Sequence, residues 1–368
     1  MHNKLLIPFF CTIITITLLA DVLIPDKYYS SSEKRKLTQI SEISVSDFPK
    51  GTMGTKFENY LADQFPLRDA LISVKTITEL MSGKTEISGV YFCKNGYLIN
   101  KFTSISKTQL NLNLKALVNF SEKLKNNNVS FQIMLVPTAA YILSDYLPDF
   151  APNISQETLI DAAKNAGLSV INPCSELFAH KDEYIYYKTD HHFTSLGAYY
   201  CYRAWRNFNN ITPEDLSSWQ EETLSENFRG TTYNKVNCPF SEYDTITAYY
   251  KNKNHAVNYN NGYYITDTIY ESKYLDTADK YAVFLNSNQA QTVITGSGTG
   301  KLLIIKDSYA NCFTQFVIDD YAETHLIDLR FFNSSVYDYI SENKITEVLV
   351  LYNIPNFAED SAIGSKLN

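Results

Sequence analysis

The stretch Lys301-Leu302-Leu303-Ile304-Ile305-Lys306-Asp307-Ser308-Tyr309 places a short apolar run directly before a serine. Residues 301–305 have the unbroken apolar character of a strand buried in a parallel sheet, and a helical pattern follows as far as Asp319. The carboxyl end of such a strand is where open α/β sheets place their ligand sites. The stretch therefore predicts an α/β fold and a candidate functional serine, although Ser308 or Asp307 before a helix could also serve as a simple N-cap.

Strand-like and helix-like segments alternate along most of the chain, which is typical of an α/β layered fold. The predicted strands are residues 129–136, 168–171, 301–305, 324–329 and 347–352. The predicted helices are residues 108–126, 156–166, 195–208 and 336–343. Residues 239–296 differ, because they are rich in Tyr, Asn and Thr with short alternating runs. We interpret them as a β-rich insertion.

The N-terminal region has a different composition from the rest of the chain. Residues 5–20 carry no charge and follow Lys4, as in an uncleaved signal anchor. We therefore predict an N-terminal transmembrane helix over residues 1–25, a polar stalk over residues 26–50, and one domain over residues 51–368. This arrangement predicts a single-pass protein of the cell membrane whose domain is extracytoplasmic.

Composition excludes several classes of function. The formal net charge of −8 leaves no basic surface for a general nucleic-acid binder. Six cysteines are scattered without a Cys-x-x-Cys pair, which disfavours a zinc ribbon or a thioredoxin-type site. The 28 tyrosines and 21 phenylalanines could stack on sugars but also fill cores, so they support a carbohydrate ligand only weakly. No cofactor is predicted.

The second candidate for chemistry is Asp190-His191-His192. A serine nucleophile needs a base, and the base needs an orienting carboxylate. In an extended segment residues i and i+2 face the same way, so we expect Asp190 and His192 to face one site and His191 to turn away. His192 would be the base for Ser308. The alternative is that Asp190 is an N-cap of the next helix and that the two histidines have no functional role.

A metal site is the competing functional interpretation. Asp190, His191, His192 and Asp307 could supply oxygen and nitrogen ligands, and the Asp-His-His triplet resembles that of DHH phosphoesterases. Those proteins need further Asp-x-Asp motifs, and this sequence has none. We therefore predict no metal at the site.

Taken together, the motifs resemble those of the DHHW protein family, which is similar to alginate O-acetyltransferases in the SGNH hydrolase class. The resemblance rests on the order of short motifs along the chain after residue 31. These are Ser32-Glu33-Lys34-Arg35-Lys36-Leu37, Asp63-Gln64-Phe65-Pro66-Leu67-Arg68-Asp69, Gly89-Val90-Tyr91, Gly96-Tyr97-Leu98, Val136-Pro137, Thr189-Asp190-His191-His192-Phe193-Thr194, Phe228-Arg229-Gly230-Thr231, Lys306-Asp307-Ser308-Tyr309-Ala310-Asn311 and Leu351-Tyr352-Asn353. The family name expects Trp where this chain has Phe193.

The resemblance implies an SGNH hydrolase-like, three-layer α/β/α domain and roles for single residues. Ser308 resembles the nucleophile, His192 the general base and Asp190 its partner. Backbone N–H groups of Ser308 and Tyr309, together with Gly230 and Asn353, are candidate oxyanion donors. His191 and Asp307 are expected to support the site.

The implied activity is O-acetyl transfer to, or acetyl-ester cleavage on, a cell-surface polysaccharide, with a membrane-bound O-acyltransferase as a partner. Two alternatives remain open. One is a non-catalytic surface module that binds glycan on the same scaffold, and the other is the metal-dependent phosphoesterase.

Overall fold

A computed structural model describes residues 3–30 and 35–368 of the chain. The chain divides into two compact units, one of residues 1–88 and 233–240 and the other of residues 89–232 and 241–368. Residues 1–2 of the predicted anchor, and residues 31–34 of the predicted stalk and of the motif that begins at Ser32, lie outside the described residues. The predicted boundaries at residues 25 and 50 stay a prediction.

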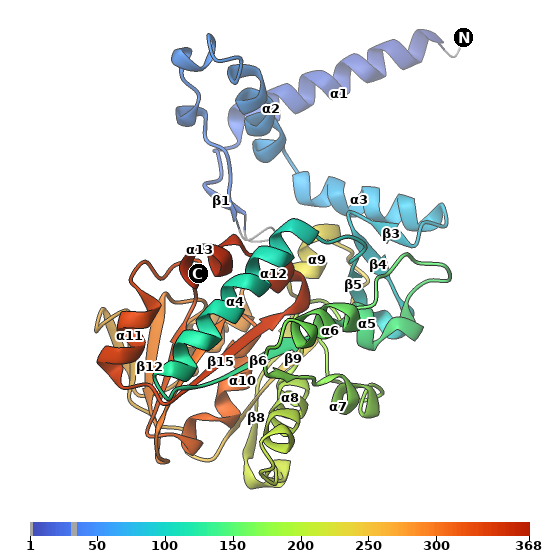
Figure 1. Ribbon diagram of the computed structural model, residues 1–368. Coiled ribbons are helices and arrows are strands. Elements are labelled where there is room, and N and C mark those ends of the chain that lie inside the picture. Colours follow the sequence, from blue (N-terminus) through green and yellow to red (C-terminus); the bar gives the residue numbers. More distant parts are fainter. Residues whose placement is uncertain (1–2, 31–34) are drawn as a thin grey trace. The chain divides into compact units, whose positions relative to one another are not determined.

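The larger unit is built on an eight-stranded mixed sheet with the strand order β11-β10-β12-β14-β13-β15-β6-β7 (Figure 1). Strands β14, β13, β15, β6 and β7 are parallel, whereas β12, β10 and β11 run antiparallel along one edge. The strand bounds are β6 (Ser130–Val136), β7 (Val170–Ile171), β10 (Val257–Tyr259), β11 (Tyr264–Thr266), β12 (Gln291–Thr295), β13 (Lys301–Lys306), β14 (Glu323–Ile327) and β15 (Glu347–Asn353). Two further antiparallel pairs are β4 (Val90–Phe92) with β5 (Leu98–Asn100) and β8 (Gln220–Phe228) with β9 (Asp244–Tyr250).

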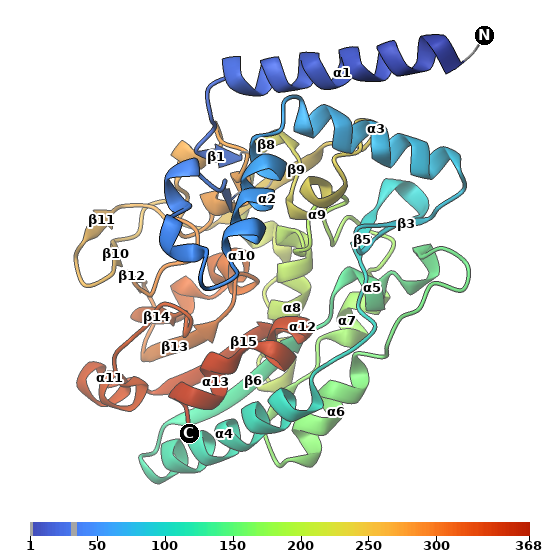
Figure 2. The same ribbon diagram turned by 90° about the horizontal axis from the view of Figure 1, so that it is seen from above.

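Both faces of the parallel part of the sheet are buried, which explains why its strands are continuously apolar. In β13, Leu302 and Ile304 join one core cluster, and Leu303 and Ile305 join the other. The first cluster includes residues of α5 (Ala139–Ile142), α7 (Cys174–Ala179), α8 (Ser195–Phe208) and α10 (Ala310–Phe313). The second includes residues of α4 (Lys107–Asn126), α6 (Glu157–Asn165), α11 (Val336–Asn343), α12 (Ile354–Glu359) and α13 (Ser361–Lys366) (Figures 1 and 2).

The structure confirms an α/β fold with a mixed sheet and all five predicted core strands, but it corrects one predicted helix. The helix expected after Tyr309 is short: α10 ends at Phe313 and gives way to 3-10 turns at Thr314–Phe316 and Ile318–Asp320. The segment predicted to be β-rich contains β9, β10, β11 and β12, and β12 pairs with β14 and extends the main sheet. Its strand β9 also pairs with β8, which lies outside the predicted range.

The smaller unit is mainly helical and contains α1 (Asn3–Leu23), α2 (Met53–Gln64) and α3 (Arg68–Met81), with the short strands β1 (Tyr29–Ser30), β2 (Arg35–Lys36) and β3 (Glu86–Ile87). Helix α9 (Thr231–Val236) starts in the larger unit. The break between α2 and α3 falls at Pro66, because proline lacks the backbone N–H that would continue the helix. Leu67 follows in the left-handed region at φ 58°, which lets α3 restart in a new direction.

The predicted transmembrane helix is not supported. A helix does form there, but among the residues that the structure describes no helix is long and apolar enough to cross a membrane.

Candidate active site

Three side chains that are far apart in the sequence form one hydrogen-bonded chain. Ser308 Oγ lies 2.7 Å from His192 Nε2, and His192 Nδ1 lies 2.5 Å from Asp190 Oδ1. All three residues are buried, with exposed fractions of 9%, 5% and 3%. An ionised carboxylate only accepts hydrogen bonds, so Nδ1 carries the imidazole proton and Nε2 presents a lone pair to the Ser308 hydroxyl. The arrangement can therefore move the serine proton onto His192.

Asp190 is held by a local turn rather than by a strand. Its Oδ1 accepts the backbone N–H of His192 at 3.0 Å in addition to the imidazole Nδ1–H. This carboxylate-to-backbone turn is a preferred local conformation of Asp. The predicted closeness of Asp190 and His192 is therefore found, but its cause is a turn and not the two-residue period of a strand.

Thr231 holds the other carboxylate oxygen of Asp190. Its backbone N–H and its hydroxyl donate to Oδ2 at 2.7 Å and 2.9 Å. Gly230 precedes it, and a Cβ at Gly230 would lie 2.2 Å from the Asp190 Cβ and 2.3 Å from Oδ2. Glycine is thus required here because the backbone passes directly against the carboxylate.

His191 does not turn away from the site, which corrects the prediction. Its ring centroid lies 3.8 Å from that of His192, and its Nδ1 lies 2.6 Å from the Thr231 hydroxyl. Since that hydroxyl has one proton, which it donates to Asp190, His191 supplies the proton of its own bond to Thr231. The Asp190 carboxylate therefore orients His192 directly and His191 through Thr231.

Asp307 shapes the turn that presents Ser308. Its Oδ1 accepts the Tyr309 N–H, and its Oδ2 accepts the backbone and side-chain N–H groups of Asn353 and the Asn356 amide, all at 2.8–3.0 Å. Burial raises the pKa of Asp307 above its usual range, although these bonds oppose the rise. Asp307 thus ties the end of β13 to the end of β15.

Most of the predicted oxyanion donors are already engaged. The Tyr309 N–H and the Asn353 N–H groups donate to Asp307, and the Gly230 N–H donates to the Thr189 hydroxyl at 3.1 Å. Within the described part of the chain, no hydrogen bond engages the Ser308 N–H. That group is the available donor of the predicted set.

The loop that carries Asp190 is anchored by a second buried carboxylate, which the sequence analysis did not single out. Asp244 accepts the backbone N–H groups of Lys188 and Thr189 and the hydroxyls of Thr189 and Tyr184 at 2.5–2.8 Å. Burial raises the pKa of Asp244, while these hydrogen bonds lower it in part. In the sequence, the only indication of this role for Asp244 is its position at the start of β9.

A fully buried lysine lies two residues before the serine. The Lys306 Nζ donates to Asn311 Oδ1 at 2.7 Å and lies 3.3 Å from Asn288 Oδ1. Burial lowers the pKa of Lys306 to about 8. Two neutral amide oxygens solvate the ammonium less well than water does, which is the physical cause of that shift.

Asp190, His191 and His192 offer ligand atoms within 4.8 Å of one another, whereas Asp307 is not part of this group. Both nitrogens of His192 are engaged, one by Asp190 and one by Ser308. A metal ion at Nε2 would have to displace the serine hydroxyl. The donor arrangement therefore favours proton transfer over metal binding.

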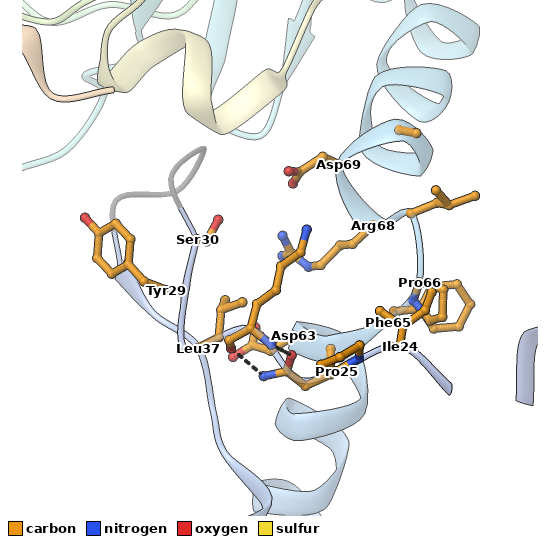
Figure 3. Close-up of a pocket in the computed structure, with 14 residues that line it drawn as sticks. Ile24, Pro25, Tyr29, Ser30, Leu37, Asp63, Phe65, Pro66, Arg68 and Asp69 are labelled. Atoms are coloured by element: carbon orange, nitrogen blue, oxygen red, sulfur yellow. Dashed lines mark hydrogen bonds between the residues drawn. The ribbon is translucent and has the colours of Figure 1, made fainter. Parts of the chain in front are cut away.

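The Asp63–Asp69 motif lies elsewhere, in the smaller unit. It lines a cavity of about 580 Å³ together with Ile24, Pro25, Lys27, Tyr29, Ser30, Leu37 and Ala70 (Figure 3). Asp63 accepts the backbone N–H and hydroxyl of Thr38 at 2.8 Å and 2.9 Å. Asp63 thus ties Thr38 to helix α2 within this unit.

Comparison with known proteins gives three results. The DHHW protein family profile matches residues 82–327. A DHHW family protein from Eubacterium siraeum DSM 15702 is 27% identical, with a TM-score of 0.67, over 77% of this chain and 96% of that one. PatB1 of Bacillus cereus is 19% identical with a TM-score of 0.63, and its form with a sulfonyl adduct is 18% identical with a TM-score of 0.60; each covers 73% of this chain and 97% of that one. No curated protein sequence matches the chain.

Replacing Gly230 should disturb the carboxylate. We expect Gly230→Ala to lower the free energy of unfolding by about 1–3 kcal/mol, because the new methyl group overlaps Asp190. Urea denaturation measures this. Gly54→Ala is the control, since a Cβ at Gly54 meets nothing within 4 Å and alanine is the better helix residue. Equal stability of Gly230→Ala and the wild type would contradict the close approach.

The lowered pKa of Lys306 should affect how the free energy of unfolding depends on pH. Its pKa is about 8 in the folded protein against an ordinary 10.5, so between these pH values the unfolded chain binds more protons. Lys306 therefore contributes a rise in stability with pH there, of at most about 1.4 kcal/mol per pH unit, relative to a variant that lacks it. In urea titrations Lys306→Met should lack this rise, whereas the exposed control Lys115→Met should keep it. Parallel curves for wild type and Lys306→Met would refute the assignment.

Proposed function

The chain belongs to the DHHW protein family, and on this premise we propose that it is a serine-dependent O-acetyltransferase or acetylesterase acting on a cell-surface polysaccharide. The observation that carries the proposal is the 2.7 Å contact between Ser308 Oγ and His192 Nε2, with Asp190 behind the imidazole. Nucleophile, base and orienting carboxylate in this order are the requirements of acyl transfer through a serine ester. The acetyl group and the sugar acceptor come from the resemblance to alginate O-acetyltransferases.

The proposed reaction has two halves. In the first, the Ser308 Oγ bonds to the carbonyl carbon of an acyl ester donor while its proton passes to His192 Nε2. The bond from that carbon to the leaving oxygen then breaks, and the leaving oxygen takes the proton from His192. In the second, a sugar hydroxyl or water gives its proton to His192 and bonds to the same carbon. Ser308 Oγ leaves and recovers the proton.

Asp190 has a defined part in both halves. Its negative charge offsets the positive charge that His192 acquires when it holds the proton. The negative oxygen of each tetrahedral intermediate needs N–H donors. We assign the Ser308 N–H as one of them.

The finer features expected from the sequence belong to the same proposal. These are the SGNH hydrolase-like three-layer architecture, an extracytoplasmic location and a membrane-bound O-acyltransferase that supplies the acyl group. Helices on both faces of the sheet support the first.

The nucleophile is tested by acetate release from an aryl acetate, measured on the full-length protein. Ser308→Ala should lower kcat/KM by about 10³-fold or more, because the covalent route is lost. Ser218→Ala, at an exposed 3-10 turn, is the matched control and should retain full activity. Undiminished activity of Ser308→Ala would rule out the serine mechanism. Loss of wild-type activity with a chelator would favour the phosphoesterase, and glycan binding without any serine labelling would favour the non-catalytic module.

The two histidines should differ in their effect on the same assay. His192→Ala removes the base and should lower kcat by about 10³-fold or more. His191→Ala removes a partner of Thr231 and the ring beside His192, but it should be milder by at least tenfold, because His192 and Asp190 keep their direct bond. The reverse order of the two effects would reassign the base to His191.

A further inference from the structure

A phenol ring covers one face of the His192 imidazole. The ring centroids of Tyr281 and His192 are 3.8 Å apart and the two planes differ by 10°. Two other rings near His192 are less parallel to it, since His191 is tilted by 39° and Tyr309 by 45°. Tyr281 itself is 4% exposed and lies in the 3-10 turn Lys280–Val283. It is therefore the parallel stacking partner of the imidazole.

The hydroxyl of the same tyrosine reaches the backbone of the serine. Tyr281 Oη donates to the main-chain carbonyl of Ser308 at 3.1 Å and lies 3.3 Å from Cys312 Sγ. Burial raises the pKa of Tyr281 well above its ordinary value, so the hydroxyl stays a donor. One side chain thus contacts the ring of the base and the turn of the nucleophile.

The Tyr281 ring is itself held by further aromatic side chains. Tyr187 meets it edge-on at 6.2 Å with an interplanar angle of 85°, and Phe284 lies 5.4 Å away at 58°. Such tilted pairs are the favoured aromatic geometry and add to the stability that area burial supplies. The ring therefore has little freedom to leave the imidazole.

The sheet topology explains how Tyr281 arrives there. Strand β12 runs antiparallel to β14, and its first residue Gln291 pairs with Ile327, the last residue of β14. The chain before β12 is thereby brought to the carboxyl edge of the parallel strands. Ser308 follows β13 at that same edge.

We propose that Tyr281 is a positioning residue whose ring keeps the His192 imidazole in line with Asp190 and Ser308 and whose hydroxyl steadies the Ser308 turn. The inference rests on the proposed serine mechanism. When His192 takes the serine proton it becomes a cation in a buried site. An aromatic face stabilises such a desolvated cation more than it stabilises the neutral ring.

Two substitutions separate the ring from the hydroxyl. Tyr281→Phe keeps the stacked ring, whereas Tyr281→Leu removes it. The matched control is Tyr259→Leu, at another buried tyrosine of the same β-rich segment that stacks on Tyr264 and not on His192. The probe is the rate at which a sulfonyl fluoride modifies Ser308 in the full-length protein, followed by mass spectrometry. This rate reports on activation of the serine by His192 and needs no sugar acceptor.

We expect Tyr281→Leu to slow the modification of Ser308 about tenfold or more and to lower kcat for an aryl acetate by a similar factor, with KM within about twofold. Tyr281→Phe should restore the rate to within about threefold of the wild type. Tyr259→Leu should react at the wild-type rate even if its thermal midpoint falls as far as that of Tyr281→Leu.

The outcomes distinguish this inference from the function on which it rests. If Ser308→Ala is inactive but Tyr281→Leu reacts at the wild-type rate, the positioning role is wrong and the serine mechanism stands. If Tyr281→Phe is as slow as Tyr281→Leu, the stacked ring is not the active part. If wild-type Ser308 is not modified while the aryl acetate is cleaved, the proposed serine mechanism is wrong, and the inference about Tyr281 falls with it.

Discussion

The Asp190 carboxylate is the interaction on which the rest of the site depends. It accepts hydrogen bonds from His192 through one oxygen and from Thr231 through the other, so it joins two chain segments that meet only in the folded protein. Because the carboxylate accepts and cannot donate while ionised, it sets which nitrogen of His192 bears the proton. Its close packing against Gly230 leaves it one position. The direction in which His192 faces Ser308 follows from that position.

The sequence could predict features that depend on local pattern or on residue chemistry. The buried parallel strands were predictable because their apolar runs are continuous. Ser308, His192 and Asp190 could be grouped because Ser308 follows a buried strand, Asp190 and His192 lie two residues apart, and the motifs that contain them occur in a characteristic order. Tyr281 could not be found in this way. It is one of 28 tyrosines, and it reaches His192 only because β12 joins the main sheet in the antiparallel direction. The orientation of His191 could not be predicted from the sequence either, since it depends on the hydroxyl of Thr231, 40 residues later in the chain.

The two kinds of buried charge near the serine have different physical roles. Asp307 is surrounded by N–H groups, so hydrogen bonds offset part of the cost of its burial and hold two strand ends together. Lys306, next to it, donates hydrogen bonds to two neutral amide oxygens, and burial lowers its pKa. The serine turn therefore contains a buried anion and a buried cation, and of these two groups the cation makes stability sensitive to mildly alkaline pH.

The placement of β15 has a consequence for how the protein is made. This strand lies between β13 and β6 in the sheet, yet it follows both in the sequence, and Asn353 and Asn356 at its end hold Asp307. The centre of the sheet and the turn of the nucleophile can close only after residue 356 has been synthesised. Pairings of such long sequence separation form slowly. A nascent chain of this protein therefore lacks the completed Ser308 turn until these late residues have been synthesised and paired.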